Sequence, residues 1–267
     1  MKEHSAHAAG YDFPVIEKGE GEAIVFVHGS VCDYRYWRDD VTTLGDQFRA
    51  IAMSRRHHWP KATKTKFSYH VEDQTDDVIA FVEALDIGPV HLIGHSYGGY
   101  LAAAFACKRP DLLKTLTLVE PGGPVEGKKM PQVMQEGILE AIDIIKQGQV
   151  EEGIKHFHRS VTSTPKWEEM PNDLRSQLIE NALTLPPQHY NPRPPLSSDA
   201  LQRFDKPTLI MIGEHTLKPF PEVANQLTEL IPQSNLVRIP DAAHPLNREN
   251  PKAFTSELLQ FLKKSWE

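Results

Sequence analysis

The 267-residue sequence has few cysteines and no long run of apolar residues. Its two cysteines, Cys32 and Cys107, are too few for a disulfide framework. Both lie beside apolar sequence typical of a core, which predicts buried free thiols. No apolar run approaches the length of a membrane span, and the polar residues 1–10 lack the apolar segment of a signal peptide. These absences predict a cytoplasmic protein that does not bind membranes.

The chain also lacks an excess of positive charge. Lys and Arg together number 29 against 36 Asp and Glu, a formal net charge of −7, so no basic surface for nucleic acid or anionic lipid is expected. The hydrophobic share of 40% and the charged share of 24% are ordinary for a globular chain with a buried core. The sequence carries no indication of oligomeric state.

A set of residues spaced to bind a metal is lacking as well. Among the 13 histidines, His57 with His58 and His156 with His158 are paired in the sequence. Neither pair has supporting ligands at suitable spacing, so we expect surface or cap positions for these residues and predict no metal site.

Short apolar runs alternate with longer amphipathic stretches, a pattern typical of a mostly parallel sheet flanked by helices. Strands are expected at residues 23–27, 48–53, 89–94, 113–119, 207–212 and 235–239. Helices are expected at residues 73–85, 98–107, 222–230 and 251–263. The pattern predicts the α/β fold class.

The alternation is interrupted after residue 122. Residues 128–185 are helical in pattern with no strand-like run, and the proline-rich residues 186–195 predict no regular element. The simplest organisation is an α/β core at 1–122 and 206–267 with a helical cap inserted at 123–205. A cap over the carboxyl ends of the strands would roof a pocket and exclude water.

The clearest motif lies around Ser96. Residues 94–98 read Gly-His-Ser-Tyr-Gly and fit the pattern G-x-S-x-G between a predicted strand and a predicted helix of small residues. A nucleophile on such a tight turn needs very small neighbours, and the helix amino terminus supplies positive potential. A plain turn would need neither the strand before the motif nor the helix after it. Ser96 is therefore the predicted nucleophile.

Two further segments follow predicted strands and complete the same chemistry. His28-Gly29-Ser30 follows the predicted strand at residues 23–27. The backbone N–H of Ser30 and that of Tyr97 are predicted to form an oxyanion hole. His244 lies between the last predicted strand and the last helix, where a neutral imidazole can accept the proton of a serine hydroxyl. His244 is therefore the predicted general base.

The motifs HGS at 28–30, GHSYGG at 94–99, LIMIGEH at 209–215 and IPDAAHPLNRENP at 239–251 resemble the α/β-hydrolase superfamily. The resemblance covers nearly the whole chain, is weakest in the cap, and is to a serine-nucleophile esterase or lactonase with a helical cap. It implies the α/β-hydrolase fold, with a mostly parallel central sheet flanked by helices. Residues 54–60 depart from the glycine-rich turn usual in these enzymes, so the pocket wall is expected to differ there.

The resemblance departs a second time at the acid of the catalytic triad. Thr216 stands where many relatives carry the aspartate. Haloalkane dehalogenases and some lactonases of the superfamily place the acid after the strand that follows the nucleophile helix, and that position here holds Glu120. Glu120 is therefore the predicted acid, which would hold the tautomer of His244, and Glu214 is the alternative.

These residues predict hydrolysis of a carboxylic ester or lactone through an acyl-enzyme, with a small apolar molecule as substrate and with no metal or organic cofactor. A serine nucleophile, unlike the aspartate of dehalogenases and epoxide hydrolases, indicates acyl transfer. Two alternatives stay open. The first is C–C bond hydrolysis, or a cofactor-free perhydrolase or oxygenase reaction, on the same triad, because function resides in the pocket. The second is a non-catalytic ligand receptor.

Overall fold

A computed structural model describes residues 1–62, 70–128, 133–191 and 193–264. Its eight strands form one sheet in the order β1-β2-β4-β3-β5-β6-β7-β8. The pairs β1–β2 and β2–β4 are antiparallel, and all other pairs are parallel. The strands are β1 (Lys2–Ala8), β2 (Tyr11–Lys18), β3 (Ala23–Val27), β4 (Arg49–Met53), β5 (Val90–His95), β6 (Leu113–Val119), β7 (Thr208–Gly213) and β8 (Ser234–Ile239).

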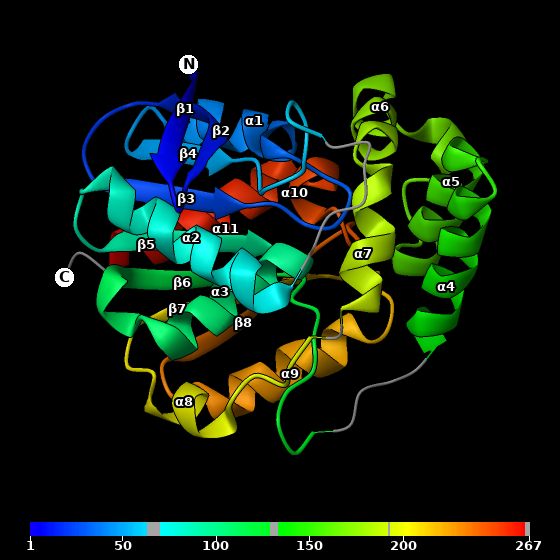
Figure 1. Ribbon diagram of the computed structural model, residues 1–267. Helices are drawn as coiled ribbons and strands as arrows, with labels where there is room; N and C mark the ends of the chain where they lie inside the picture. Colours follow the sequence, from blue (N-terminus) through cyan, green and yellow to red (C-terminus); the bar gives the residue numbers. More distant parts are fainter. Residues whose placement is uncertain (63–69, 129–132, 192, 265–267) are drawn as a thin grey trace.

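Helices cover both faces of this sheet (Figure 1). One face packs against α2 (Val71–Leu85), α3 (Tyr97–Lys108), α8 (Ser198–Arg203) and α9 (Phe220–Leu230). The other packs against α1 (Arg38–Leu44), α10 (Leu246–Glu249) and α11 (Pro251–Lys264). Short 3₁₀ helices are η1 (Tyr34–Trp37), η2 (Pro110–Leu112), η3 (Trp167–Glu169) and η4 (Ala182–Thr184).

The central strand β3 shows why these residues form a doubly covered sheet. Ile24 and Phe26 belong to the hydrophobic cluster beneath α1 and α11, whereas Val25 and Val27 belong to the cluster beneath α2 and α3. All four are completely buried. Successive side chains of a strand point to opposite faces, so a continuous apolar run suits a parallel sheet covered on both sides. Each such side chain contributes about 1.5–3 kcal/mol of burial free energy.

The six predicted strands are confirmed as β3 to β8, each within one residue of the expected bounds, and the four predicted helices within two. The strands β1 and β2 were not predicted. Of the seven residues of β1, five are exposed, and the strand lies at the edge of the sheet beside β2. An edge strand with so little buried surface has no apolar pattern that would reveal it.

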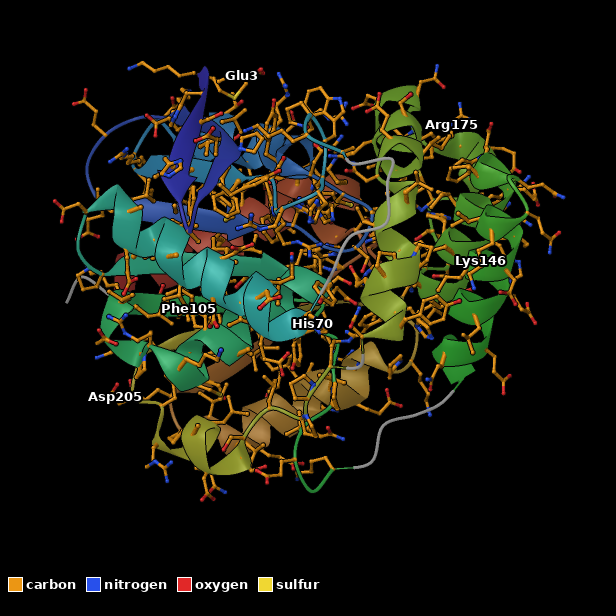
Figure 2. The ribbon with its side chains drawn as sticks, viewed as in Figure 1. Glu3, His70, Phe105, Lys146, Arg175 and Asp205 are labelled. Atoms are coloured by element: carbon orange, nitrogen blue, oxygen red, sulfur yellow. The ribbon has the colours of Figure 1, made fainter. Side chains whose placement is uncertain are left out.

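The remaining four helices are inserted between β6 and α8 and lie together at one end of the sheet (Figure 1). They are α4 (Val133–Lys146), α5 (Val150–Val161), α6 (Asn172–Glu180) and α7 (Leu185–Tyr190). An isolated parallel bridge joins Val125 to Leu196, so the two ends of the inserted segment lie side by side. In Figure 2, Lys146 and Arg175 lie on these helices, and Phe105 lies on α3 beside the sheet.

The expectation that no regular element occurs in residues 186–195 was wrong. Helix α7 begins at Leu185 and carries Pro186 and Pro187 in its first turn. Proline is tolerated there because the first N–H groups of a helix have no intrahelical acceptor. The expected cap range of 123–205 also contains α8, which contacts α3 and α9 of the core. That boundary stays a prediction.

Both cysteines are free thiols, Cys32 buried and Cys107 half-buried. Burial raises the pKa of the Cys32 thiol to about 12. Within the described residues, every helix is too short or too polar to cross a bilayer.

Candidate active site

Ser96 occupies a strained turn between β5 and α3. Its backbone has φ +54° and ψ −115°, a conformation that non-glycine residues rarely adopt. A Cβ on Gly98 would lie 2.3 Å from the carbonyl oxygen of Val27, and one on Gly94 would lie 2.2 Å from the carbonyl oxygen of Gly98. The turn therefore requires glycine on both sides of the serine, as the motif predicts.

Glu120 follows β6 directly and is completely buried. Its Oε1 atom accepts hydrogen bonds from the backbone N–H of Gly213 at 2.6 Å and from the hydroxyl of Thr216 at 2.5 Å. Thr216 is the residue that stands in place of the aspartate of many relatives. The two possible positions for a triad acid, after β6 and after β7, are thus in direct contact.

His244 lies against Glu120 at the same edge of the sheet. Its Nδ1 atom is 3.2 Å from Oε2 of Glu120. The imidazole is stacked on the ring of Phe220, with ring centroids 4.1 Å apart, and lies 4.7 Å from the ring of His95. The Nε2–H of His95 donates to the carbonyl oxygen of His244 at 3.0 Å. These two neighbouring rings limit the rotation of the imidazole.

Burial dominates the electrostatics of this pair. It raises the pKa of the Glu120 carboxyl to about 8, against the lowering effect of the two donors from Gly213 and Thr216. Burial also lowers the pKa of His244 to about 3. The resting imidazole is therefore neutral, as a general base must be. A positive imidazole is best tolerated here together with a negative carboxylate, because each charge alone is poorly solvated.

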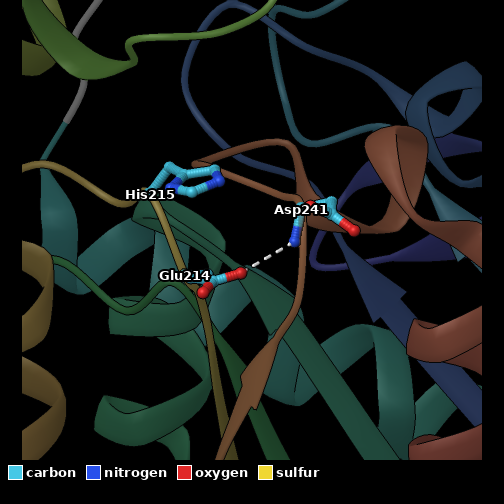
Figure 3. Close-up of side chains that lie close together, drawn as sticks. All are labelled: Glu214, His215 and Asp241. Atoms are coloured by element: carbon cyan, nitrogen blue, oxygen red, sulfur yellow. Dashed lines mark hydrogen bonds between the residues drawn. The ribbon is translucent and has the colours of Figure 1, made fainter.

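Glu214, the alternative acid, has different contacts from those of Glu120. It is exposed, and its Oε2 atom accepts a hydrogen bond from the backbone N–H of Asp241 at 3.1 Å (Figure 3). Potential ligand atoms of Glu214, His215 and Asp241 lie within 4.8 Å of one another, the single such group found among the described residues. All three side chains are exposed, and exposed acidic groups commonly meet without binding a metal, so we assign no ion to them.

Two cavities meet at Ser96. The first has a volume of about 340 Å³, and we call it the polar cavity because its lining includes Ser30, Ser96, Tyr97, Gln188 and Arg193. Apolar side chains such as Ile138 and Phe157 line it as well. The second, the apolar cavity, has a volume of about 60 Å³, and its lining includes Ser96, His244, Cys32, Met170, Leu174 and Leu178. Ser96 and Ser30 thus border both cavities, whereas His244 borders the apolar cavity and Tyr97 the polar cavity.

The segment after β4 supports the loop that carries Ser30. Arg55 is buried, and its Nη2 donates to the carbonyl oxygen of Gly29 at 2.9 Å, while its backbone N–H donates to Nε2 of His28 at 3.0 Å. A Cβ on Gly29 would lie 3.2 Å from Cβ of Ser96, so this loop lies directly against the turn that carries Ser96.

The surface position expected for His58 was wrong. Its side chain is completely buried, and its ring lies 4.7 Å from that of His28. Burial and the positive charge of Arg55 hold the pKa of His58 well below its usual range. His158, expected in the cap, lies on α5, is also buried, and lines the apolar cavity.

Several residues of the site were missed in the sequence. The side-chain amide of Gln188, on α7, donates to the hydroxyl of Ser30 at 2.6 Å. Arg193 lines the polar cavity, and Phe220 stacks on His244. Gln188 and Arg193 lie in the proline-rich stretch that was expected to be irregular, and no sequence pattern connects that stretch to residue 30.

The sequence model of the Alpha/beta hydrolase family matches residues 24–257. The chain belongs to the Alpha/beta hydrolase family. Its eight-stranded, mostly parallel sheet with helices on both faces confirms the expected fold.

Members of the family that resemble this chain include several hydrolases. The 2-(acetamidomethylene)succinate hydrolase of Mesorhizobium japonicum is 24% identical, over 93% of this chain and 90% of the relative. The solved structure of an enol-lactonase from Burkholderia xenovorans LB400 has a TM-score of 0.79 at 20% identity, over 97% of this chain and 99% of that one. A thermophilic esterase from Thermogutta terrifontis has a TM-score of 0.76 at 24% identity, over 99% and 98%.

Proposed function

We propose that this protein is a serine hydrolase that cleaves a carboxylic ester or lactone through an acyl-enzyme. The observation that carries the proposal is the contact between Nδ1 of His244 and Oε2 of Glu120 at 3.2 Å, beside a cavity that Ser96 and His244 both line. A buried carboxylate, an imidazole and a hydroxyl on a strained turn are the parts of a nucleophilic triad.

In the first half of the reaction, the Ser96 hydroxyl attacks the carbonyl carbon while Nε2 of His244 takes its proton. Glu120 accepts a hydrogen bond from the Nδ1–H of His244, which keeps that proton, and the carboxylate balances the positive charge of the imidazolium. The backbone N–H groups of Ser30 and Tyr97 hold the negative oxygen, each donor contributing about 3 kcal/mol to the transition state. The C–O bond to the alcohol then breaks, and the alcohol leaves with the proton from His244.

In the second half, water attacks the acyl-enzyme and gives a proton to His244. The bond from the Ser96 oxygen to the acyl carbon breaks, and that proton returns to the serine oxygen as the acid leaves. A lactone follows the same steps, except that its alcohol stays attached to the acyl group. Every proton is carried by His244, so the scheme uses only this chain's residues and water.

The inserted helices α4 to α7 supply residues to both cavities, including Phe157 of α5 and Gln188 of α7. We propose that they act as a cap that excludes water and determines which substrate fits. The esterase and the enol-lactonase similar to this chain support the ester and lactone classes. C–C bond hydrolysis, or a perhydrolase or oxygenase reaction, would use the same triad and is distinguished by its products.

A covalent probe tests the proposed nucleophile. We expect a fluorophosphonate to label the wild-type protein at one serine, because the probe reacts with an activated hydroxyl. Ser96→Ala should abolish both the labelling, measured by intact mass, and the hydrolysis of p-nitrophenyl butanoate. Ser160→Ala is the matched control, since Ser160 lies on α5 and its hydroxyl bonds the carbonyl oxygen of His156. Absence of labelling in folded wild-type protein would favour a non-catalytic receptor.

A further inference from the structure

Arg193 is a cation that faces the polar cavity, and no described carboxylate is paired with it. It follows α7 and lines the same cavity as Ser96. Its Nη1 donates to the carbonyl oxygen of Gly122 at 3.3 Å, and its guanidinium carbon lies 5.3 Å and 5.8 Å from the ring centroids of Tyr97 and Tyr100. Among the residues for which coordinates are described, no carboxylate forms an ion pair with it, although most other arginines here have one.

The environment of Arg193 makes an unpaired positive charge costly. Its side chain is half-buried, and desolvation lowers the pKa of its guanidinium. Arginine nevertheless stays charged in proteins, so the desolvated charge needs a compensating group. The aromatic faces of Tyr97 and Tyr100 and one carbonyl oxygen compensate only in part. A planar guanidinium is best satisfied by a carboxylate, which accepts two parallel hydrogen bonds.

The rest of the polar cavity fits the same type of ligand. Gln188 and Asn191 bring side-chain amides to its wall, which donate to the Ser30 hydroxyl and to the carbonyl oxygen of Pro187. No Asp or Glu is found among the described residues that line the cavity. The apolar cavity on the other side of Ser96 is lined mainly by apolar side chains such as Leu174 and Leu178. A substrate bound across Ser96 would therefore meet positive charge on one side only.

We propose that Arg193 binds a carboxylate of the substrate, so that this hydrolase acts on esters or lactones that carry a free carboxyl group. The proposal rests on the function proposed above for Ser96 and narrows its substrate class. Such a substrate differs from the apolar molecule that the sequence predicts. The carboxylate lies in the polar cavity, and the reacting carbonyl lies at Ser96 between the two cavities.

Matched pairs of esters test the proposal. Monomethyl glutarate and methyl pentanoate differ by a carboxylate on the acyl part, and 3-acetoxypropanoate and propyl acetate differ by one on the alcohol part. In at least one pair we expect kcat/KM of the wild type to be at least about tenfold higher for the acid, since a hydrogen-bonded charge contributes that much. Arg193→Gln should remove this preference, because it lowers kcat/KM of the acid at least about tenfold more than that of the neutral ester.

Two further variants separate binding of the substrate from a structural role. Arg193→Lys keeps the charge and should retain part of the preference for the acid. Arg203→Gln is the control, because Arg203 is an exposed arginine on α8 outside both cavities, and it should leave every rate unchanged. If Arg193→Gln lowers the rates for acid and neutral esters equally, or if the wild type shows no preference in either pair, the proposal is overturned.

A binding measurement makes the test independent of turnover. We expect calorimetry to detect glutarate binding to the wild type and at least about tenfold weaker binding to Arg193→Gln. Equal binding to the two proteins would contradict the proposal. If Arg193 proves unimportant while fluorophosphonate labelling of Ser96 and hydrolysis of neutral esters persist, the serine hydrolase function stands and only its substrate class is wrong.

Discussion

At the scale of single residues, the proposed chemistry depends on how Glu120 is held. The carboxyl group is buried, accepts hydrogen bonds from Gly213 and Thr216 through Oε1, and contacts His244 through Oε2. One oxygen therefore fixes the side chain and the other remains for the imidazole. Glu214 has no comparable arrangement, because it is exposed and bonds the backbone of Asp241.

Exchange of each carboxyl for an amide tests this difference. Glu120→Gln should lower kcat/KM for p-nitrophenyl butanoate by roughly 10²- to 10⁴-fold, because the amide cannot balance the charge of an imidazolium. Glu214→Gln should stay within about threefold of the wild type, since surface substitutions have small effects. Initial rates at fixed pH give the comparison, and the opposite ranking would show that the acid had been assigned to the wrong residue.

At the scale of the elements, helix propensity and steric space favour different residues in the turn from β5 to α3. Gly98 lies in the first turn of α3, where alanine has the higher helix propensity by about 1 kcal/mol. A Cβ at this position would nevertheless lie 2.3 Å and 2.5 Å from the carbonyl oxygens of Val27 and His28. Backbone atoms of β3 and of the loop after it cannot yield as a flexible side chain can, so the steric effect should dominate.

Gly98→Ala should therefore destabilise the protein by about 1–3 kcal/mol, instead of stabilising it, and should reduce ester hydrolysis. Urea denaturation followed by circular dichroism measures the change in the free energy of unfolding. Gly10→Ala is the control, because Gly10 has φ +67° with nothing near its Cβ position, so it costs only about 1–2 kcal/mol of backbone strain. The control should keep full activity. A more stable Gly98→Ala protein would contradict the close approach of α3 to β3.

At the scale of the whole molecule, two buried groups affect how stability depends on pH. The pKa of Glu120 is raised to about 8, so the stability that this group contributes is fully present below its ordinary pKa and is lost as pH rises through about 8. The pKa of His244 is lowered to about 3, so its contribution is fully present above its ordinary pKa and is lost as pH falls through about 3. The two contributions decline in opposite directions.

Glu120→Gln should accordingly flatten the alkaline side of the stability profile. Between pH 5 and pH 9 we expect its Tm to fall less than that of the wild type, since the amide has no proton to lose. Differential scanning calorimetry at several pH values measures the two profiles. Glu214→Gln removes an exposed charge and should follow the wild type. Parallel profiles for Glu120→Gln and the wild type would mean that this carboxyl is already ionised at pH 5.

The sequence by itself determined most of the α/β core and the places of the predicted site residues. Strands buried on both faces require continuous apolar runs such as Ala23–Val27, and a nucleophile turn requires glycine on both sides. These constraints act on residues that are close together in the chain, so the amino-acid sequence itself shows them. The carboxyl ends of parallel strands meet at one edge of the sheet, which is why Ser96, Glu120 and His244 could be expected together.

Only the tertiary structure decided which further side chains lie in and around the site of Ser96, Glu120 and His244. The position of Arg193 opposite Tyr97, the bond of Gln188 to Ser30 and the burial of His58 depend on contacts between segments far apart in the chain. Such contacts involve single polar side chains, which follow no period and need no particular neighbours in the sequence. The core is specified by repeated hydrophobic burial, whereas the pocket is specified by individual polar contacts that exist only once the chain has folded.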